Sequence, residues 1–144
     1  VWTVPPENSK TNKAIRRPIS SLMKEILNKL ATVYGNFEYI IPGSNPRKPM
    51  TTHNINRYCC RVWEQLFEKY NMPKFIPHDA RRSLSTLLSE HGVAPHVTEK
   101  MLGHTMRGVM AVYNKHDWMK EQREGYELYC NLIHKFVIGE TIKI

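Results

Sequence analysis

Residues 77–116 have the sequence PHDARRSLSTLLSEHGVAPHVTEKMLGHTMRGVMAVYNKH. This stretch contains most of the side chains that indicate what the chain does. His78 and Arg81 lie three residues apart, Gly103-His104 follows a helical pattern, and Tyr113 lies nine residues beyond His104. An arginine offers a planar fork of donors that matches two phosphate oxygens, and imidazoles add further donors. A tyrosine hydroxyl can attack phosphorus and hold it covalently. The stretch therefore combines a phosphate-binding set with a candidate nucleophile.

The same stretch predicts two helices that would position these side chains. Asp79 is the expected N-cap of a helix that runs to His91 and ends at Gly92. Arg81 would then lie in the first turn, where backbone N–H groups attract anions. A second helix is bracketed by Pro95 and Gly103, so that His104 emerges from its C-terminus. Residues 109–113 are expected to form a short helix.

Outside this stretch, apolar spacing and turn residues predict a mostly helical chain with a small N-terminal sheet. The predicted elements are strands within 1–4 and 14–19, a helix from Ser20 or Ser21 to Gly35, a short strand at 37–41, a helix from Thr51 or Thr52 to Asn71, and a helix at 119–136. The first of these helices is expected to pack into the core. The fold class is therefore α+β, mainly α, with a β-hairpin 1–19, a helical body 20–136 and a C-terminal tail 137–144 in which a strand could form.

Composition indicates an acidic partner and gives no sign of a metal site. The 144 residues carry 21 Lys and Arg against 13 Asp and Glu, a net charge of +8. Nucleic acid is the usual partner of such a chain, although a solvated basic surface is the alternative. Three cysteines, two of them adjacent at Cys59 and Cys60, suggest neither a disulfide framework nor a zinc site. No apolar run approaches the ~20 residues of a membrane span, and a soluble cytoplasmic protein is expected.

The order H-x-x-R, then L-G-H, then Y resembles the tyrosine recombinases, the phage integrase family. The wording from His78 to Asp117 is most similar to integrases of enterobacterial prophages and genomic islands. The resemblance implies the catalytic-domain fold of that family, N-terminally truncated, and site-specific DNA recombination in prophage integration and excision. It covers nearly all of this chain but only the C-terminal part of a catalytic domain. A further family arginine and the DNA-reading domains are expected to lie upstream, so this fragment alone should cleave poorly or not at all.

The chemistry of phosphodiester cleavage suggests a role for each candidate residue. Arg81 is the main phosphate clamp, and His104 donates to the same phosphate. His78 acts as acid or base and helps to position the nucleophile. Tyr113 attacks phosphorus to give a 3′-phosphotyrosine and a 5′-hydroxyl. The resemblance makes Lys10 the candidate general acid, because Lys10-Thr11-Asn12 matches a K-T-G-like turn of the family.

The expected partners follow from the basic charge and from the family resemblance. Double-stranded DNA at attachment sites is the expected substrate, with Arg107 and Lys13 assigned to DNA contacts. The helix that begins near Thr52 carries Arg57, Arg61 and Lys69 on one face, which either lies close to DNA or is simply solvated. A homotetramer on DNA, DNA-bending accessory proteins and a place at the bacterial nucleoid are expected. No cofactor or metal is expected, since the sequence has neither a nucleotide-binding loop nor clustered carboxylates.

Two other functions fit the same residues. The chain could be a non-catalytic DNA-binding fragment or a degenerate prophage remnant, which binds DNA without cutting it. Type IB topoisomerase chemistry uses the same residue types without exchanging strands between programmed partners. Each candidate residue taken singly is more often structural or solvated. Their joint order and spacing favour the recombinase.

Overall fold

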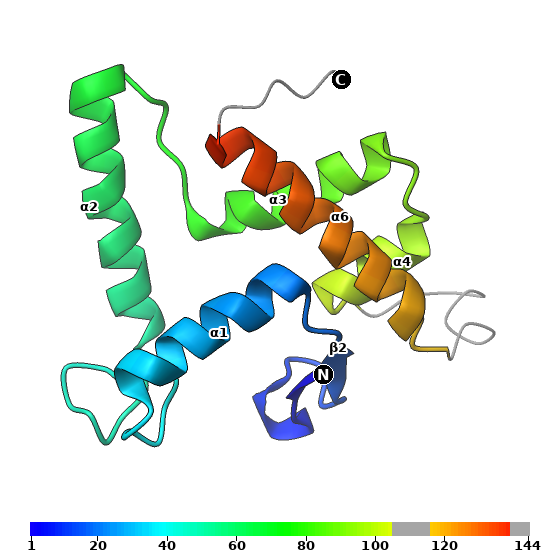
Figure 1. Ribbon diagram of the computed structural model, residues 1–144, viewed down its shortest axis with the longest axis horizontal. Helices are drawn as coiled ribbons and strands as arrows, with labels where there is room; N and C mark the ends of the chain where they lie inside the picture. Colours follow the sequence, from blue (N-terminus) through cyan, green and yellow to red (C-terminus); the bar gives the residue numbers. More distant parts are fainter. Residues whose placement is uncertain (105–115, 139–144) are drawn as a thin grey trace. The chain divides into compact units, whose positions relative to one another are not determined.

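The structure is a computed structural model that describes residues 1–104 and 116–138 (Figure 1). The chain divides into two compact units. Unit 1 holds Val1–Lys24 and the described residues from Leu84 onward, and unit 2 is Glu25–Ser83. Arg107, Tyr113, the predicted short helix at 109–113 and residues 139–144 of the tail lie outside the described residues.

The N-terminal hairpin of unit 1 is the small sheet that the sequence predicts. Strand β1 (Trp2–Val4) pairs antiparallel with β2 (Ile15–Arg17), with Trp2 opposite Arg17. The connection contains a single 3₁₀ turn, η1 (Pro6–Asn8), and a tight turn in which the Asn12 amide donates to the Ser9 carbonyl. Asn12 adopts φ 50°, a left-handed conformation that asparagine tolerates better than most residues.

The remaining described elements are helices. They are α1 (Ser21–Tyr34), α2 (Thr52–Tyr70), α3 (Pro77–Glu90), α4 (Pro95–Leu102) and α6 (Met119–Ile138). A mainly helical chain with one two-stranded sheet confirms the predicted α+β class. Helix α6 begins where the sequence predicts and continues two residues beyond the predicted end at 136, so residues 137 and 138 of the expected tail are helical.

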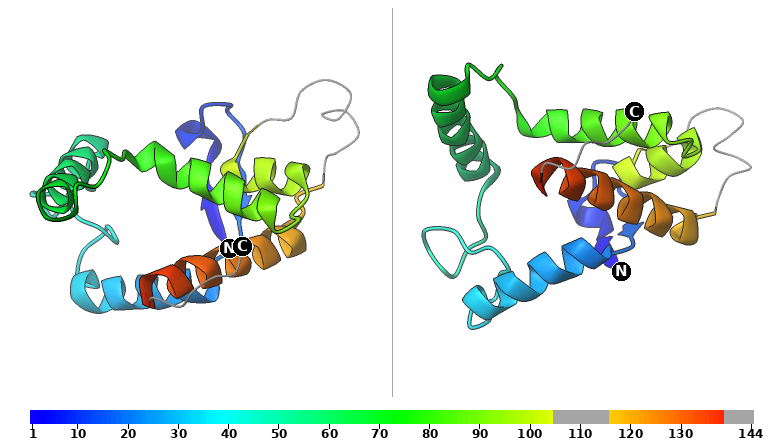
Figure 2. Two further views of the ribbon diagram at one scale, coloured as in Figure 1. Left: turned by 90° about the horizontal axis from the view of Figure 1, so that it is seen from above. Right: turned by 45° about the horizontal axis from the view of Figure 1, so that its top comes forward.

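The buried core of the described residues lies in unit 1. Leu88 of α3 and Val97 and Met101 of α4 are buried together, and partly buried side chains of α6 pack against them. Figure 2 shows α4 and α6 side by side. A Cβ atom at Gly125 would come within 2.9 Å of the Met101 sulfur, so the missing side chain lets the two helices approach closely. Burial of this apolar surface holds the three helices together.

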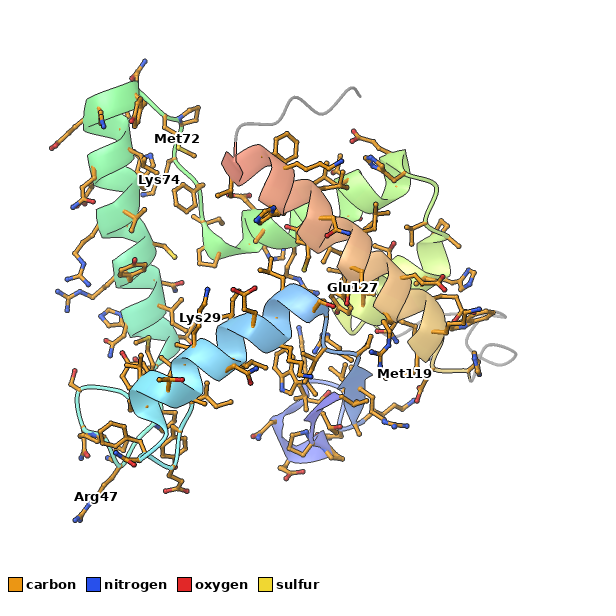
Figure 3. All side chains as sticks on the ribbon, viewed as in Figure 1. Lys29, Arg47, Met72, Lys74, Met119 and Glu127 are labelled. Carbon is orange, nitrogen blue, oxygen red and sulfur yellow. The ribbon has the colours of Figure 1, made fainter. Side chains whose placement is uncertain are left out.

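Helix α1 is fixed to α6 at its first turn. The Ser20 hydroxyl accepts from the amide of Met23, as an N-cap residue does, and lies 3.2 Å from the Cys130 sulfur. The amide and hydroxyl of Ser21 both donate to Glu127 of α6, at 2.7 and 2.9 Å (Figure 3). A carboxylate at this end of a helix is favoured by the helix dipole.

Three local expectations from the sequence are wrong. No residue of α1 is buried, because the core of the described residues gathers on α3, α4 and α6. Residues 37–41 form bends instead of a strand. Within the described part of the chain, the pairing next to them is limited to an isolated bridge between Pro42 and Pro49. Proline has no N–H to extend a ladder. Helix α3 begins at Pro77, two residues before the expected cap at Asp79, since proline is well suited to a first helical position.

Candidate functional site

His78 and Arg81 are the second and fifth residues of α3, in unit 2, so Arg81 lies just after the first turn instead of within it. Asp79 occupies the third position of this helix, and its carboxylate accepts from the Ile76 amide at 2.8 Å. This contact is one half of a capping box, in which a side chain reaches back to the residue before the helix. The His78 side chain is exposed and that of Arg81 is half-buried. The start of the helix that carries both candidate phosphate ligands is therefore fixed by a local contact.

The segment that leads into α3 packs on α2 within unit 2. The Trp63 indole N–H donates to the Met72 carbonyl at 3.1 Å, and the Lys74 ammonium lies 5.2 Å from the centre of the Trp63 ring (Figure 3). Helix α2 ends at Asn71, as the sequence predicts. Asn71 adopts a left-handed conformation, and its amide donates to the Phe67 carbonyl. These contacts determine how the chain turns from α2 toward His78.

His104 follows a Schellman motif at the end of α4, in unit 1. Gly103 has φ 72°, its amide donates to the Lys100 carbonyl, and the His104 amide donates to the Glu99 carbonyl, both at 2.9 Å. A Cβ atom at Gly103 would lie 2.7 Å from Arg17 Nη2, so this position also lacks room for a side chain. The sequence predicts this exit from the helix correctly.

The imidazole of His104 has a carboxylate partner. Nδ1 of His104 lies 2.8 Å from Oε2 of Glu99, and the two side chains are 49% and 47% exposed. Glu99 therefore contacts His104 twice, through its backbone carbonyl and through its side chain. No motif in the sequence pointed to Glu99. Glu99 and His104 are five residues apart, and their side chains meet because the left-handed Gly103 reverses the direction of the backbone after α4.

The C-terminus of α4 is held by two neighbouring elements. The Met101 carbonyl accepts from Nε of Arg17 on β2 and from the hydroxyl of Tyr126 on α6, both at 2.8 Å. A carbonyl in the last turn of a helix has no partner within the helix, so it needs donors from elsewhere. Nothing in the sequence links Arg17 to Met101, because the two residues lie 84 positions apart.

Lys10 and Lys13 both lie in the turn that connects η1 to β2. Both side chains are exposed. The turn is closed by the contact of Ser9 with Asn12 and by the hydroxyls of Ser9 and Thr11, which lie 3.1 Å apart. Asn12, at the position where the family pattern has glycine, adopts a left-handed conformation, which glycine populates without strain. The choice of Lys10 over Lys13 as general acid stays a prediction.

The candidate residues are distributed over both units. His78 and Arg81 belong to unit 2, and Lys10 and His104 belong to unit 1. Their gathering around one phosphate stays a prediction, as do the roles of Tyr113 and Arg107.

Trp118 contacts two histidine rings. The centroid of its ring lies 5.0 Å from that of His116 and 4.6 Å from that of His96.

Two other features are absent from the described residues. Among residues 1–104 and 116–138 there is no group of three or more His, Cys, Asp or Glu side chains that could hold a metal ion. None of the described helices is both long and apolar enough to span a membrane.

Comparisons with known proteins agree with the residue pattern. The model of the phage integrase family matches residues 1–119. Prophage integrase IntA of Escherichia coli K12 is 26% identical over 143 residues, 98% of this chain and 33% of its own length. Prophage integrase IntZ of the same strain is 26% identical over 138 residues, again 33% of its length. No solved structure matches significantly. The chain thus spans about a third of these relatives, and it belongs to the phage integrase family, the tyrosine recombinases.

Proposed function

We propose that the chain is the C-terminal part of the catalytic domain of a site-specific recombinase that cleaves and rejoins DNA through Tyr113. One observation carries the proposal: the family match over residues 1–119 contains H-x-x-R, L-G-H and Tyr113 in the expected order. Two relatives whose names describe prophage integrases support it further. DNA at prophage attachment sites is the proposed substrate.

The proposed reaction begins with attack of the Tyr113 oxygen on a phosphodiester. The P–O bond to tyrosine forms as the P–O bond to the 5′ oxygen breaks, which leaves a 3′-phosphotyrosine and a 5′-hydroxyl. The phenol has an ordinary pKa of ~10 and must lose its proton to a base during the attack. His78 is the proposed base, and Lys10 gives a proton to the departing 5′ oxygen.

Negative charge accumulates on the non-bridging oxygens during this displacement. Arg81 is the proposed clamp on these oxygens and His104 a second donor, and the loss of one such donor commonly costs a few kcal/mol of transition-state stabilisation. The support for Arg81 is its position as the fifth residue of α3, just after the first turn and close to the helix N-terminus, whose dipole favours an anion.

Strand exchange then follows by reversal of the same chemistry. A 5′-hydroxyl from a second strand attacks the phosphotyrosine and releases Tyr113, so the energy of the broken bond is kept and ATP is not needed. We further propose a homotetramer on DNA, DNA contacts through Arg107 and Lys13, DNA-bending accessory proteins, and action at the bacterial nucleoid. Recombination needs two duplexes and four strand cuts, which four copies would supply.

Trapping of the covalent intermediate tests the proposal. A pool of nicked duplexes with randomised sequence would be incubated with two proteins, the 144-residue chain and the longest reading frame that contains it. Loss of the short 5′-hydroxyl strand should trap an SDS-resistant, protease-sensitive adduct. We expect this adduct from the longer protein and not from its Tyr113→Phe variant.

The outcomes separate the alternatives. If neither protein forms an adduct although both bind DNA, the non-catalytic binding function replaces the recombinase. If the adduct forms equally in Tyr113→Phe, another residue is the nucleophile. Relaxation of supercoiled plasmid that lacks any selected sequence would instead indicate topoisomerase activity.

A further inference from the structure

We propose that Glu99 is a positioning residue for His104: its carboxylate accepts from Nδ1–H and thereby directs Nε2 to the phosphate, to which Nε2–H donates when the ring is in its doubly protonated imidazolium form. The inference rests on the proposed function, within which His104 donates to a non-bridging phosphate oxygen. It starts from the distance of 2.8 Å between Glu99 Oε2 and His104 Nδ1.

The direction of this hydrogen bond follows from the chemistry of the two groups. An ionised carboxylate can only accept, so the ring nitrogen that faces it must carry a proton. With the Nδ1 proton committed to Glu99, Nε2 is the nitrogen proposed to face the substrate, and it donates to a phosphate oxygen when a second proton makes the ring an imidazolium. The same arrangement of a carboxylate behind a histidine fixes the tautomer and ring orientation in metal sites and in hydrolase triads.

The backbone makes the geometry reproducible. The Schellman motif fixes the His104 main chain against the Glu99 carbonyl at 2.9 Å, so the two side chains start from backbone positions that are already joined. The carboxylate contact then selects one orientation of the ring. A substitution of the Glu99 side chain leaves the backbone contact in place. Its effect therefore reports the orientation of the His104 ring and not the position of the His104 backbone.

Three substitutions isolate the contact. Glu99→Ala removes the acceptor and keeps a good helix former, whereas Glu99→Gln keeps an acceptor oxygen without the charge. Glu124→Ala is the matched control, because it removes the same charge from an exposed position of α6 in the same unit.

The first measurement does not depend on catalysis. Long-range ¹H–¹⁵N NMR spectra of the 144-residue chain at about pH 8, above the ordinary imidazole pKa of ~6.5, report which ring nitrogen carries the proton. A His104→Ala spectrum identifies the His104 signals. We expect an Nδ1–H tautomer in the wild type and in Glu99→Gln, and movement of the proton toward Nε2 in Glu99→Ala. An unchanged tautomer in Glu99→Ala would overturn the inference.

The second measurement is the rate of adduct formation in one turnover by the longer protein. Glu99→Ala should slow it roughly 10- to 100-fold, as losses of orienting partners do, while DNA affinity stays equal to that of Glu124→Ala. Glu99→Gln should recover most of the rate. In a His104→Ala background, Glu99→Ala should have no further effect, and an equal slowing there would sink the positioning role.

The two measurements distinguish failure of this inference from failure of the proposed function. If the wild type forms no adduct, the proposed function fails and the phosphate role of Nε2 fails with it. If the adduct forms normally and Glu99→Ala reacts as fast as wild type, only the role of Glu99 is overturned.

Discussion

The carbonyl oxygen of Met101 joins three elements at one atom, since it accepts from Arg17 of β2 and Tyr126 of α6 while it belongs to α4. These contacts lie two residues before Gly103 and three before His104. The hairpin and α6 therefore stabilise the helix end from which the candidate phosphate donor emerges. Stability at this point and placement of His104 depend on the same contacts.

Removal of both donors should cost more than the sum of the two single changes. Tyr126→Phe and Arg17→Met should each lower the free energy of unfolding by about 1 kcal/mol, because one donor still satisfies the carbonyl. The double variant leaves a partly buried carbonyl without either donor, and we expect an extra loss of roughly 1 kcal/mol or more. Urea denaturation of the four proteins measures the coupling, and strict additivity would contradict the shared role.

Gly103 and Gly92 form a matched pair for a test of steric crowding. Both have positive φ, 72° and 75°, but a Cβ atom at Gly103 would meet Arg17 and Ile15 whereas one at Gly92 meets nothing within 4 Å. Gly92→Ala should cost roughly 1–2 kcal/mol of stability from the left-handed backbone alone. Gly103→Ala should cost more, and the difference in unfolding free energy measures the contact. Equal losses would show that Arg17 and Ile15 move aside freely.

Tyr129 gives the chain an alkaline dependence of stability. Burial, and secondly the charge of Cys130, raises the pKa of the Tyr129 phenol above its ordinary value of 10.0. The folded state then holds this proton more tightly than the unfolded state, so the contribution is complete below pH 10.0 and is lost as pH rises through the raised pKa. Above pH 10.0, the unfolding free energy of Tyr129→Phe should therefore fall less steeply with pH than that of the wild type. Urea denaturation over a range of pH measures both proteins, and an identical dependence of unfolding free energy on pH would refute this role of Tyr129.

At the scale of elements, the first turn of α3 depends on Asp79. Asp79→Ala removes the bond to the Ile76 amide and should destabilise the chain by about 1 kcal/mol, the usual cost of a lost helix cap. Arg82→Ala is the control, because it removes only the exposed ion pair with Asp79 at 3.2 Å, worth at most about 0.5 kcal/mol. Circular dichroism during denaturation measures both. A larger loss in Arg82→Ala would mean that the ion pair, and not the cap, holds the turn.

Elements with strong local rules were predictable, and those that depend on distant contacts were not. Thr51 caps α2 and Asn71 ends it as expected, because a hydroxyl and a left-handed asparagine act within a few residues. Residues 37–41 have the composition of a strand, but a strand also needs a partner, which spacing alone does not show. The same limit hid the roles of Glu99 and Arg17, whose partners are chosen by the fold.

At the scale of the whole molecule, the net charge of +8 is the main sequence property that bears on DNA. Charge alone does not separate a DNA-binding face from a solvated one. Arg57, Arg61 and Lys69 are all exposed on α2, which is consistent with either interpretation. The dependence of binding on salt can decide between them, because each phosphate contact releases bound counterions.

If α2 lies on DNA, the triple variant Arg57→Gln, Arg61→Gln, Lys69→Gln should weaken binding to a random duplex and reduce the salt slope. Each lost phosphate contact lowers the magnitude of the slope of log K against log salt by about 0.9, so three contacts give a change of about 2.7. The control is Lys29→Gln, Arg47→Gln, Lys48→Gln, which removes the same charge from other exposed positions of unit 2. Fluorescence anisotropy over a range of salt concentrations measures both slopes.

A large change of slope in the α2 variant and a small one in the control would place α2 at the DNA, since long-range charge alone would affect the two variants equally. Equal changes would assign α2 to solvent and leave the net charge as the source of attraction.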